Sequence, residues 1–282
     1  MQQDFVEIMS LIYIAQQSTI YGGIFLFVIG VIGNLLNIII FSTTREYRQT
    51  VSSFLFLVNS IDSLIHILFN LTLRILSVGF GIDLARKSLI ICRMRSYSIT
   101  TLTLISLNCS SLAAIDQFLF TSRSQKLREL SHMKQAYRVV FIMILFWIAH
   151  GIPYLIFYEI PSTTGTCINT NSIYANYLIV AAFLLLFIIP VFILIFFGYL
   201  SYRNIHRIRI LSEQHADRQL TQMMLMQAAL VCLSTAPYTI LNVFSVATTR
   251  VIKDLDQQMK EYLIAAITNL ISYFHFVVNL FI

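Results

Sequence analysis

Five polar residues stand inside stretches of the sequence that are otherwise apolar. They are Asn34, Asp62, Ser106, His275 and Asn279. Polar and ionisable side chains are costly to place in such stretches, so each is a candidate functional residue. A buried carboxylate such as that of Asp62 needs hydrogen-bond donors or a cation beside it. We therefore expect an interior polar network, which either holds helices together or takes part in a switch.

The elements that must carry these residues are seven stretches, each long and apolar enough to cross a membrane. A bilayer core about 30 Å thick needs about 20 residues of helix, and 57% of the residues are hydrophobic whereas 11% are charged. Backbone polar groups find no water in lipid, which favours helices. The sequence predicts an all-α fold, a seven-transmembrane helix bundle that occupies residues 1–282 as a single domain. The predicted spans are Thr19–Ser42, Ser52–Ser77, Leu89–Phe120, Tyr137–Ile160, Ile173–Tyr202, Gln222–Thr248 and Tyr262–Ile282.

The charged residues between the spans predict how the bundle lies in the membrane. The links after the first, third and fifth spans are basic, with Arg45, Arg128 and Arg203 as examples. The tail before the first span carries Asp4 and Glu7 but no Lys or Arg. Basic links face the cytosol, so we expect an extracellular N-terminus in a multi-pass protein of the plasma membrane. The net charge of +6 then reports topology and does not predict binding to nucleic acid.

Two of the four cysteines fall on the predicted outer side of the membrane. Cys92 begins the third span, and Cys167 lies between the fourth and fifth spans. Disulfides form in oxidising compartments, so the sequence predicts a bond between Cys92 and Cys167. Cys109 and Cys232 lie within spans and are expected to be small packing residues.

An ordered set of residues, with members in each span, resembles the rhodopsin-like (class A) G protein-coupled receptors over nearly the whole chain. The set consists of Gly33-Asn34, Asp62, Cys92, Asp116-Gln117-Phe118, Trp147, Cys167, Pro190, Pro237 and Asn279. The resemblance implies a receptor that passes a signal from an extracellular ligand to a heterotrimeric G protein, with helix six pivoting at its proline. The switch and G protein-coupling residues that it implies are Asp116, Gln117, Phe118, Asp217, Pro237 and Asn279.

Four positions depart from the family's pattern. Gln117 replaces the Arg of the Asp-Arg-Tyr motif, so it offers neutral hydrogen bonds, which are about half as strong as charge-assisted ones. Thr235 replaces the Trp ahead of the helix-six proline, and Gly198 replaces a helix-five Tyr. The chain stops shortly after Asn279, so the helix-seven Tyr, the amphipathic helix after it and the C-terminal tail are expected to be missing. The Gln117 replacement predicts a weaker resting-state latch, with raised basal activity or altered coupling.

Residues at the outer ends of the spans predict which ligands bind. Ile99 stands where amine receptors carry an Asp, which disfavours a monoamine. No Lys lies between Tyr262 and Ile282, so a retinal Schiff base is excluded and no organic cofactor is expected. The outer ends carry basic and aromatic side chains, which suit a carboxylate, a peptide C-terminus or another small anionic or polar molecule. The candidate ligand-binding residues are Arg74, Arg95, Tyr97, Ile99, Tyr238, Asn242 and Tyr273.

Other interpretations of these polar residues stay open. The arginines could instead extend to lipid head groups while the tyrosines form an interfacial belt, and Arg93 is expected to contact lipid or a loop. Asp62 and Ser106 resemble part of a sodium-binding cluster, although His275 and Phe276 stand where further polar ligands often lie. Waters are an equal alternative to sodium at that position.

Three function classes follow. The first is a receptor for a neuropeptide-like ligand or a small anionic or polar molecule. The second is a seven-helix transporter or channel, although the inverted repeats usual in transporters are not evident. The third is a receptor-like protein that has lost G protein coupling, which the Gln117 and Thr235 replacements keep open. An enzyme is not expected, because the sequence contains no Gly-x-Ser-x-Gly, His-Glu-x-x-His or Gly-rich phosphate loop.

Overall fold

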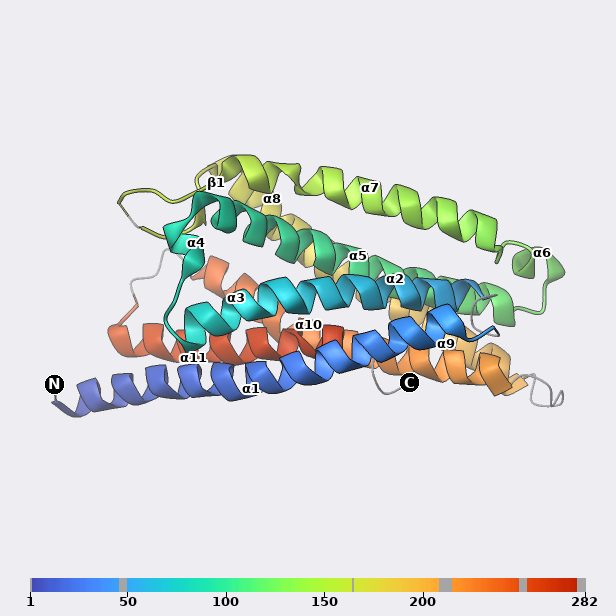
Figure 1. The fold of residues 1–282 in the computed structure, drawn as a ribbon, viewed down its shortest axis with the longest axis horizontal. Coiled ribbons are helices and arrows are strands. Elements are labelled where there is room, and N and C mark those ends of the chain that lie inside the picture. Colours follow the sequence, from blue (N-terminus) through green and yellow to red (C-terminus); the bar gives the residue numbers. More distant parts are fainter. Residues whose placement is uncertain (1, 46–49, 164, 208–214, 249–252, 278–282) are drawn as a thin grey trace.

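The computed structural model describes residues 2–45, 50–163, 165–207, 215–248 and 253–277. Almost all of these residues are helical, and the helices form long rods that run side by side in alternating directions (Figure 1). The helices, including π-helical segments labelled η, and the strands are α1 (Gln2–Thr43), α2 (Val51–His66), η2 (Ile67–Leu71), α3 (Thr72–Arg74), η3 (Ile75–Gly79), α4 (Leu84–Lys87), α5 (Leu89–Thr121), α6 (Gln125–Arg128), α7 (Met133–Phe157), β1 (Tyr158–Glu159), β2 (Ile168–Asn169), α8 (Ser172–Phe183), η4 (Leu184–Ile188), α9 (Ile189–Arg207), α10 (His215–Ala247), α11 (Leu255–Ser272) and α12 (Phe274–Val277). The prediction of an all-α bundle is confirmed.

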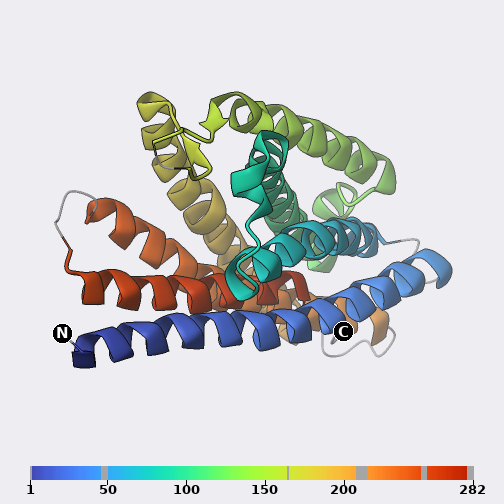
Figure 2. The same cartoon turned by 60° about the vertical axis from the view of Figure 1, so that its left-hand side comes forward.

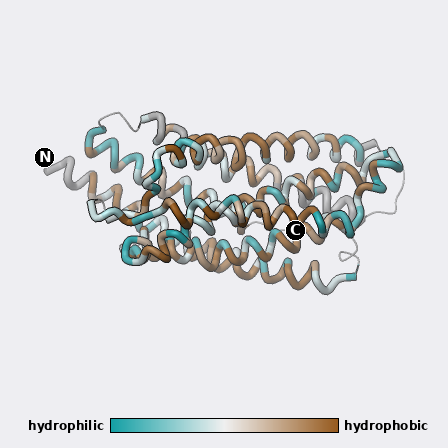
Figure 3. The backbone as a smooth tube through the Cα atoms, turned by 90° about the horizontal axis from the view of Figure 1, so that it is seen from above, coloured by the Kyte–Doolittle hydropathy of each residue, from teal (hydrophilic) through white to brown (hydrophobic). Residues whose placement is uncertain are grey.

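Five of the described helical stretches are long and apolar enough to cross a membrane. They are Ile8–Thr43, Val51–Gly79, Leu89–Thr121, Met133–Phe157 and Ser172–Asn204. The sixth predicted span corresponds to α10, which holds a shorter apolar stretch, Ala228–Asn242. The seventh corresponds to α11 and α12, and its last predicted residues, 278–282, lie outside the described residues. Apolar residues fill the middle of the rods, and hydrophilic residues gather toward the two ends (Figure 3).

The first helix is longer than the sequence predicted. α1 begins at Gln2, well before the predicted start at Thr19. The residues ahead of Thr19 contain no Pro or Gly, so nothing in the backbone chemistry ends the helix there. α1 packs along α11, and the two rods lie side by side in Figure 2. The apolar span within α1 also begins before Thr19, at Ile8.

The fourth span ends earlier than predicted. α7 stops at Phe157, and Tyr158 and Glu159 form β1 instead of a helical turn. This strand pairs antiparallel with β2, so that Tyr158 lies opposite Asn169. The prediction that the helix continues through Ile160 is therefore wrong. The backbone groups of this segment are satisfied across the two strands instead.

α5 is the central rod of the bundle, because it packs against α2, α7, α9 and α10. Leu107 on α5 is fully buried and packs in one apolar cluster with Leu55, Leu194 and Val231 from the neighbouring rods. Large apolar side chains on the outer surface are exposed, with Phe192 as an example. Such a surface is unfavourable in water and suits contact with lipid tails. The interior of this bundle therefore positions the polar residues that the sequence singled out.

Candidate functional site

One end of the bundle carries a disulfide-linked hairpin. Cys92, in the first turn of α5, is bonded to Cys167, and their Cα atoms lie 5.6 Å apart. The predicted disulfide is confirmed. Arg93 donates a hydrogen bond from Nε to the carbonyl of Tyr158, at 3.0 Å, so this arginine contacts the loop as predicted. Burial raises the pKa of the Tyr158 phenol, which keeps this group neutral and available as a hydrogen-bond donor.

A cavity of about 410 Å³ opens between the helices at this end. Cavities of about 300–1,000 Å³ are the usual size of small-molecule sites. The cavity brings together six of the seven predicted ligand-binding residues, namely Arg74, Arg95, Ile99, Tyr238, Asn242 and Tyr273. Tyr97 is not among the lining residues. Its ring lies against α7, where a Cβ added to Gly151 would come within 2.5 Å of Tyr97 Cε2.

Arg74 is the most notable charge in this cavity. Its Nη2 donates to the carbonyl of Ala266 at 3.3 Å, and its buried Nε has no hydrogen-bond partner among the described residues. Its electrostatic neighbours include Tyr273 and a second cation, Arg95. A buried guanidinium beside another cation is unfavourable unless an anion compensates the charge.

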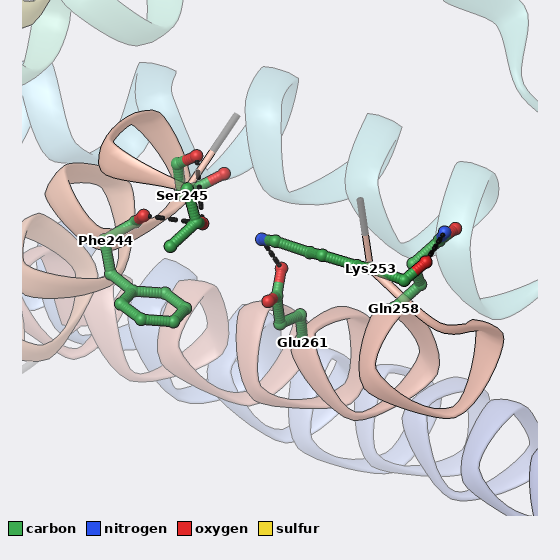
Figure 4. Close-up of polar contacts among 6 residues, drawn as sticks. Phe244, Ser245, Lys253, Gln258 and Glu261 are labelled. Carbon is green, nitrogen blue, oxygen red and sulfur yellow. Dashed lines mark hydrogen bonds and ion pairs between the residues drawn. The ribbon is translucent and has the colours of Figure 1, made fainter. Parts of the chain in front are cut away.

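Three other cations at the same end of the bundle have acidic partners. Lys253 Nζ lies 2.6 Å from Glu261 Oε2 and 5.4 Å from the centre of the Phe244 ring (Figure 4). Gln258 donates to the carbonyl of Lys253 at 3.0 Å, which connects the start of α11 to the segment just before it. The charge of Lys253 is therefore compensated within the protein.

The same holds for two exposed cations nearby. The pairs are Arg86 with Asp83 at 3.1 Å and Lys260 with Asp256 at 2.8 Å. Among the described residues, neither Arg74 nor Arg95 forms an ion pair with an acid, and no Asp or Glu lines the cavity. The cavity thus carries two positive charges that the described part of the chain does not compensate.

The opposite wall of the cavity is apolar. It is formed by α8 and η4, and each of its lining residues is hydrophobic: Leu178, Ile179, Ala181, Ala182, Phe183, Leu185 and Leu186. The sequence analysis did not find this wall, because its residues do not stand out from the apolar run around them. The cavity can therefore bind a molecule with one anionic end and one apolar body.

His66 is a cavity residue that the sequence analysis missed. It is 3% exposed, and neither ring nitrogen has a hydrogen-bond partner in the part of the chain that the structure describes. Its ring stacks on Phe276, with centroids 4.0 Å apart and planes inclined by 8°. The sequence did contain a signal for His66, because an ionisable side chain inside an apolar span is a functional candidate by default.

The polar network predicted in the interior forms two separate links between helices. Ser106 on α5 donates to Asn59 Oδ1 at 2.6 Å and shares a hydrogen bond of 2.9 Å with His275 Nε2. Asn34 on α1 donates to the carbonyl of Phe276 at 2.9 Å. These bonds join α2, α5 and α12 to one another, and α1 to α12. Asn279 lies outside the described residues.

Asp62 is buried, and no described residue forms a hydrogen bond with its Oδ2. The geometry fits a sodium ion between Asp62 and Ser106 poorly, because the Ser106 hydroxyl is engaged by Asn59 and His275. The described residues contain no group of three or more His, Cys, Asp or Glu side chains that could hold a metal ion. Sodium at this position stays a prediction, and we derive no step from it.

The opposite end of α5 carries a hydrogen-bonded cluster around Asp116. Ser52 on α2 donates to Asp116 Oδ2 at 2.6 Å, and Ser131 donates to Oδ1 at 2.5 Å. Gln117 Nε2 in turn donates to Ser52 Oγ at 2.8 Å. The two predicted switch residues, Asp116 and Gln117, therefore meet at Ser52, which the sequence analysis did not identify. Nothing in the type or spacing of Ser52 and Ser131 distinguishes them from other serines of the chain.

The remaining predicted switch residues have different surroundings. The Phe118 ring lies 5.5 Å from that of Phe197 on α9. Pro237 lies inside α10, and Thr235, which lines the cavity, donates to the carbonyl of Val231 at 2.7 Å. The side chain of Asp217 lies outside the described residues.

Pro190, the second residue of α9, follows the π-helical segment η4. A proline removes one helical hydrogen bond and crowds the preceding turn, and a π-helical turn in a helix often coincides with such a defect. The widened turn at Leu184–Ile188 also supplies part of the apolar cavity wall. The proline, the altered turn and the cavity therefore lie in the same part of the fifth rod.

The comparison with known families agrees with this geometry. The family model described as 7 transmembrane receptor (rhodopsin family) matches residues 33–282. The match covers most of the chain, so this protein belongs to the rhodopsin family of seven-transmembrane receptors. A comparison with curated proteins finds no match.

Proposed function

We propose that this receptor binds an extracellular ligand with an anionic group in the cavity at the disulfide end, and activates a heterotrimeric G protein at the Asp116 end. The observation that carries the proposal is the pair Arg74 and Arg95, two cations that line a cavity without an acidic partner among the described residues. The receptor acts at the plasma membrane, where its disulfide end faces the extracellular side.

The chemistry of the cavity supports a carboxylate as the anionic group. An arginine binds a carboxylate through two parallel hydrogen bonds, and such bonds are about twice as strong as neutral ones. Arg74 Nε has no partner in the described part of the protein and is available for this role. The apolar wall of α8 and η4 would receive the body of the ligand. A small amphipathic acid and the free C-terminus of a peptide with apolar side chains both match this description.

The floor of the cavity supports a route from ligand to G protein. His275 and Phe276 line the cavity, His275 bonds Ser106, and the Phe276 carbonyl accepts a hydrogen bond from Asn34. A ligand that contacts this floor differently in two arrangements of the helices shifts the balance between them. Thr235 lines the cavity from α10, close to the proline at which α10 would pivot.

At the other end, the proposal assigns the resting-state latch to neutral donors. Ser52 and Ser131 hold the Asp116 carboxylate, and Gln117 takes the place of the family's arginine. A neutral Gln117 cannot form an ion pair with an acid, so the resting state loses a charge-assisted contact. The proposal therefore includes raised basal signalling.

The test uses matched ligand pools. Cells displaying the receptor receive one G protein subtype at a time. They are exposed to peptide pools with free C-termini and to the same peptides with amidated C-termini. They are also exposed to pools of aryl-alkyl carboxylates and to pools of the corresponding alcohols. The proposal predicts a response to a free-acid pool and a much weaker response to its neutral counterpart. The response should be lost in Arg74→Gln and kept in Arg86→Gln, whose arginine is paired with Asp83 outside the cavity.

A second candidate is a receptor-like protein without G protein coupling, which the Gln117 and Thr235 replacements favour. Binding of a free acid that depends on Arg74, together with silence across all G protein subtypes, would favour this candidate. A response to amidated pools as strong as to free-acid pools would contradict the ligand chemistry proposed above.

A further inference from the structure

Ser131 lies in the short link between α6 and α7, at the end of the bundle opposite to the hairpin (Figure 1). It is half-buried, and its hydroxyl donates to Asp116 Oδ1 at 2.5 Å. This short distance is typical of a charge-assisted bond to a carboxylate. The link between two helices thus reaches back and holds the carboxylate at the foot of α5.

The residues around Ser131 form a basic recognition sequence. Arg128 stands three positions before Ser131, and Lys126 and Lys134 flank the link. Arg128, Lys126 and Lys134 are all exposed. An exposed arginine at this spacing is what one class of serine kinases recognises. The sequence around the serine and the bond that the serine makes are independent observations.

We propose that Ser131 is a phosphorylation site for an arginine-directed serine kinase, and that phosphorylation releases Asp116 from the link. The proposal rests on the orientation in the proposed function, which places this end in the cytosol. The disulfide at the other end supports that orientation, because disulfides persist in oxidising compartments and ATP-dependent kinases act in the cytosol. Helix α5, with 33 residues, separates the two ends by about 50 Å.

The reaction is a phosphoryl transfer from ATP. The Ser131 hydroxyl oxygen forms a bond to the γ-phosphorus of ATP, the bond from that phosphorus to the β,γ-bridging oxygen breaks, ADP leaves, and the hydroxyl proton is released. The kinase must first open the link, since Ser131 Oγ is engaged by Asp116 in the structure. Opening the link also breaks turn bonds, such as that from Ser131 N to the carbonyl of Arg128 at 3.1 Å.

Phosphorylated Ser131 cannot form its hydrogen bond to Asp116 again. A phosphate adds a charge of about −1.5 to −2 and carries acceptor oxygens, and a carboxylate is also only an acceptor. The bond between position 131 and Asp116 is therefore replaced by like-charge repulsion. Arg128 and the neighbouring lysines offer the phosphate a favourable place outside the bundle. Asp116 keeps Ser52 as a donor, and the latch is weakened.

The first experiment asks whether the site is modified. The purified receptor in lipid nanodiscs is incubated with ATP and a calmodulin-dependent protein kinase, which accepts Arg-x-x-Ser sequences, and is then digested with trypsin. Cleavage after Arg128 and Lys134 gives the peptide of residues 129–134, in which Ser131 is the only hydroxyl side chain. We expect phosphate on this peptide. We expect much less on the matching peptide of the Arg128→Gln variant, which runs over residues 127–134 because cleavage then follows Lys126. Absence of phosphate on residue 131 would overturn the proposal.

The second experiment asks whether phosphate opens the link. Amide hydrogen exchange is measured for residues 127–133, where the amides of Glu129, Leu130 and Ser131 are hydrogen-bonded in the structure. Loss of a hydrogen bond to a charged group predicts exchange at least about fivefold faster after phosphorylation. Ser131→Ala, which removes the bond without adding charge, should have a smaller effect. Ser124→Asp, which adds charge at an exposed serine without a bond to Asp116, should have none.

Two outcomes would contradict the proposal. Unchanged exchange in the phosphorylated receptor would show that Asp116 is not released, and acceleration by Ser124→Asp equal to that by phosphorylation of Ser131 would show a general charge effect. An epitope at the N-terminus, probed on intact cells, reports the orientation of the receptor in the membrane. It therefore separates failure of the phosphorylation proposal from failure of the proposed function. An epitope on the cytosolic side would refute the orientation itself, whereas an extracellular epitope with an unmodified Ser131 would refute the phosphorylation alone.

Discussion

Replacing Ser52 with alanine removes the hydroxyl at which the two switch residues meet. In the structure this hydroxyl donates to Asp116 Oδ2 at 2.6 Å and accepts from Gln117 Nε2 at 2.8 Å. A hydrogen bond to a charged group contributes about 1.5–3 kcal/mol and a neutral one about 0.5–1.5 kcal/mol. The sum is about 2–4.5 kcal/mol for the two bonds. If both bonds belong to the resting arrangement, the resting state loses at least about 2 kcal/mol relative to the active one, a factor of about 30 in their ratio.

The assay is ligand-free nucleotide exchange on a G protein added to membranes that contain equal amounts of receptor. We expect a clear increase in basal exchange for Ser52→Ala over the parent receptor. The matched control is Ser53→Ala, which removes a neighbouring, equally buried hydroxyl that accepts a hydrogen bond from Thr50 and has no bond to Asp116 or Gln117. Equal basal exchange for the two variants would refute the assignment of the latch to Ser52.

Three further changes test other parts of the account. Gln117→Arg should lower basal exchange, because an arginine restores a charge-assisted contact to the neighbouring carboxylate; an unchanged basal level would count against the weak-latch hypothesis. Arg74→Gln should weaken binding of a free-acid ligand about 10- to 100-fold in a competition assay, and an effect no larger than that of Arg86→Gln would remove Arg74 from the site. Asn34→Ala should lower the melting temperature of the purified receptor, because it deletes the link to the Phe276 carbonyl, worth about 0.6–1.7 kcal/mol in a membrane bundle; an unshifted melting curve would show that this link does not stabilise the fold.

The sequence predicted the helical bundle from its long apolar stretches, and the disulfide from two cysteines on the same side of the membrane. Six of the seven residues proposed for ligand binding line one cavity, and the helical period explains part of this grouping. Arg95 and Ile99 both line the cavity, as residues four apart share one face of a helix. The same spacing explains the failure at Tyr97. Tyr97 follows Arg95 by two residues, which is more than half a helical turn. The Tyr97 ring therefore lies against α7 instead of in the cavity. The helical period alone therefore predicts that Tyr97 does not share a face with Arg95 and Ile99.

Other features could not be predicted, since they depend on contacts between distant segments. Ser52 and Ser131 are ordinary serines in the sequence, and only the packing of α2 and the α6–α7 link against α5 brings both to Asp116. The strand that replaces the last turn of α7 likewise depends on its pairing with β2. His66 differs from these residues, because its position in an apolar span was a sufficient signal.

The central claim is that a charge-compensating ligand at the disulfide end changes the state of the Asp116 end. The most direct measurement is nucleotide exchange in membranes that contain the receptor and one heterotrimeric G protein at a time, first without ligand and then with the free-acid pools. We expect at least one heterotrimer to exchange nucleotide above the level of receptor-free membranes, and a free-acid pool to increase this rate only while Arg74 is present. Exchange at the receptor-free level for every heterotrimer, with the receptor displayed at the cell surface, would contradict it.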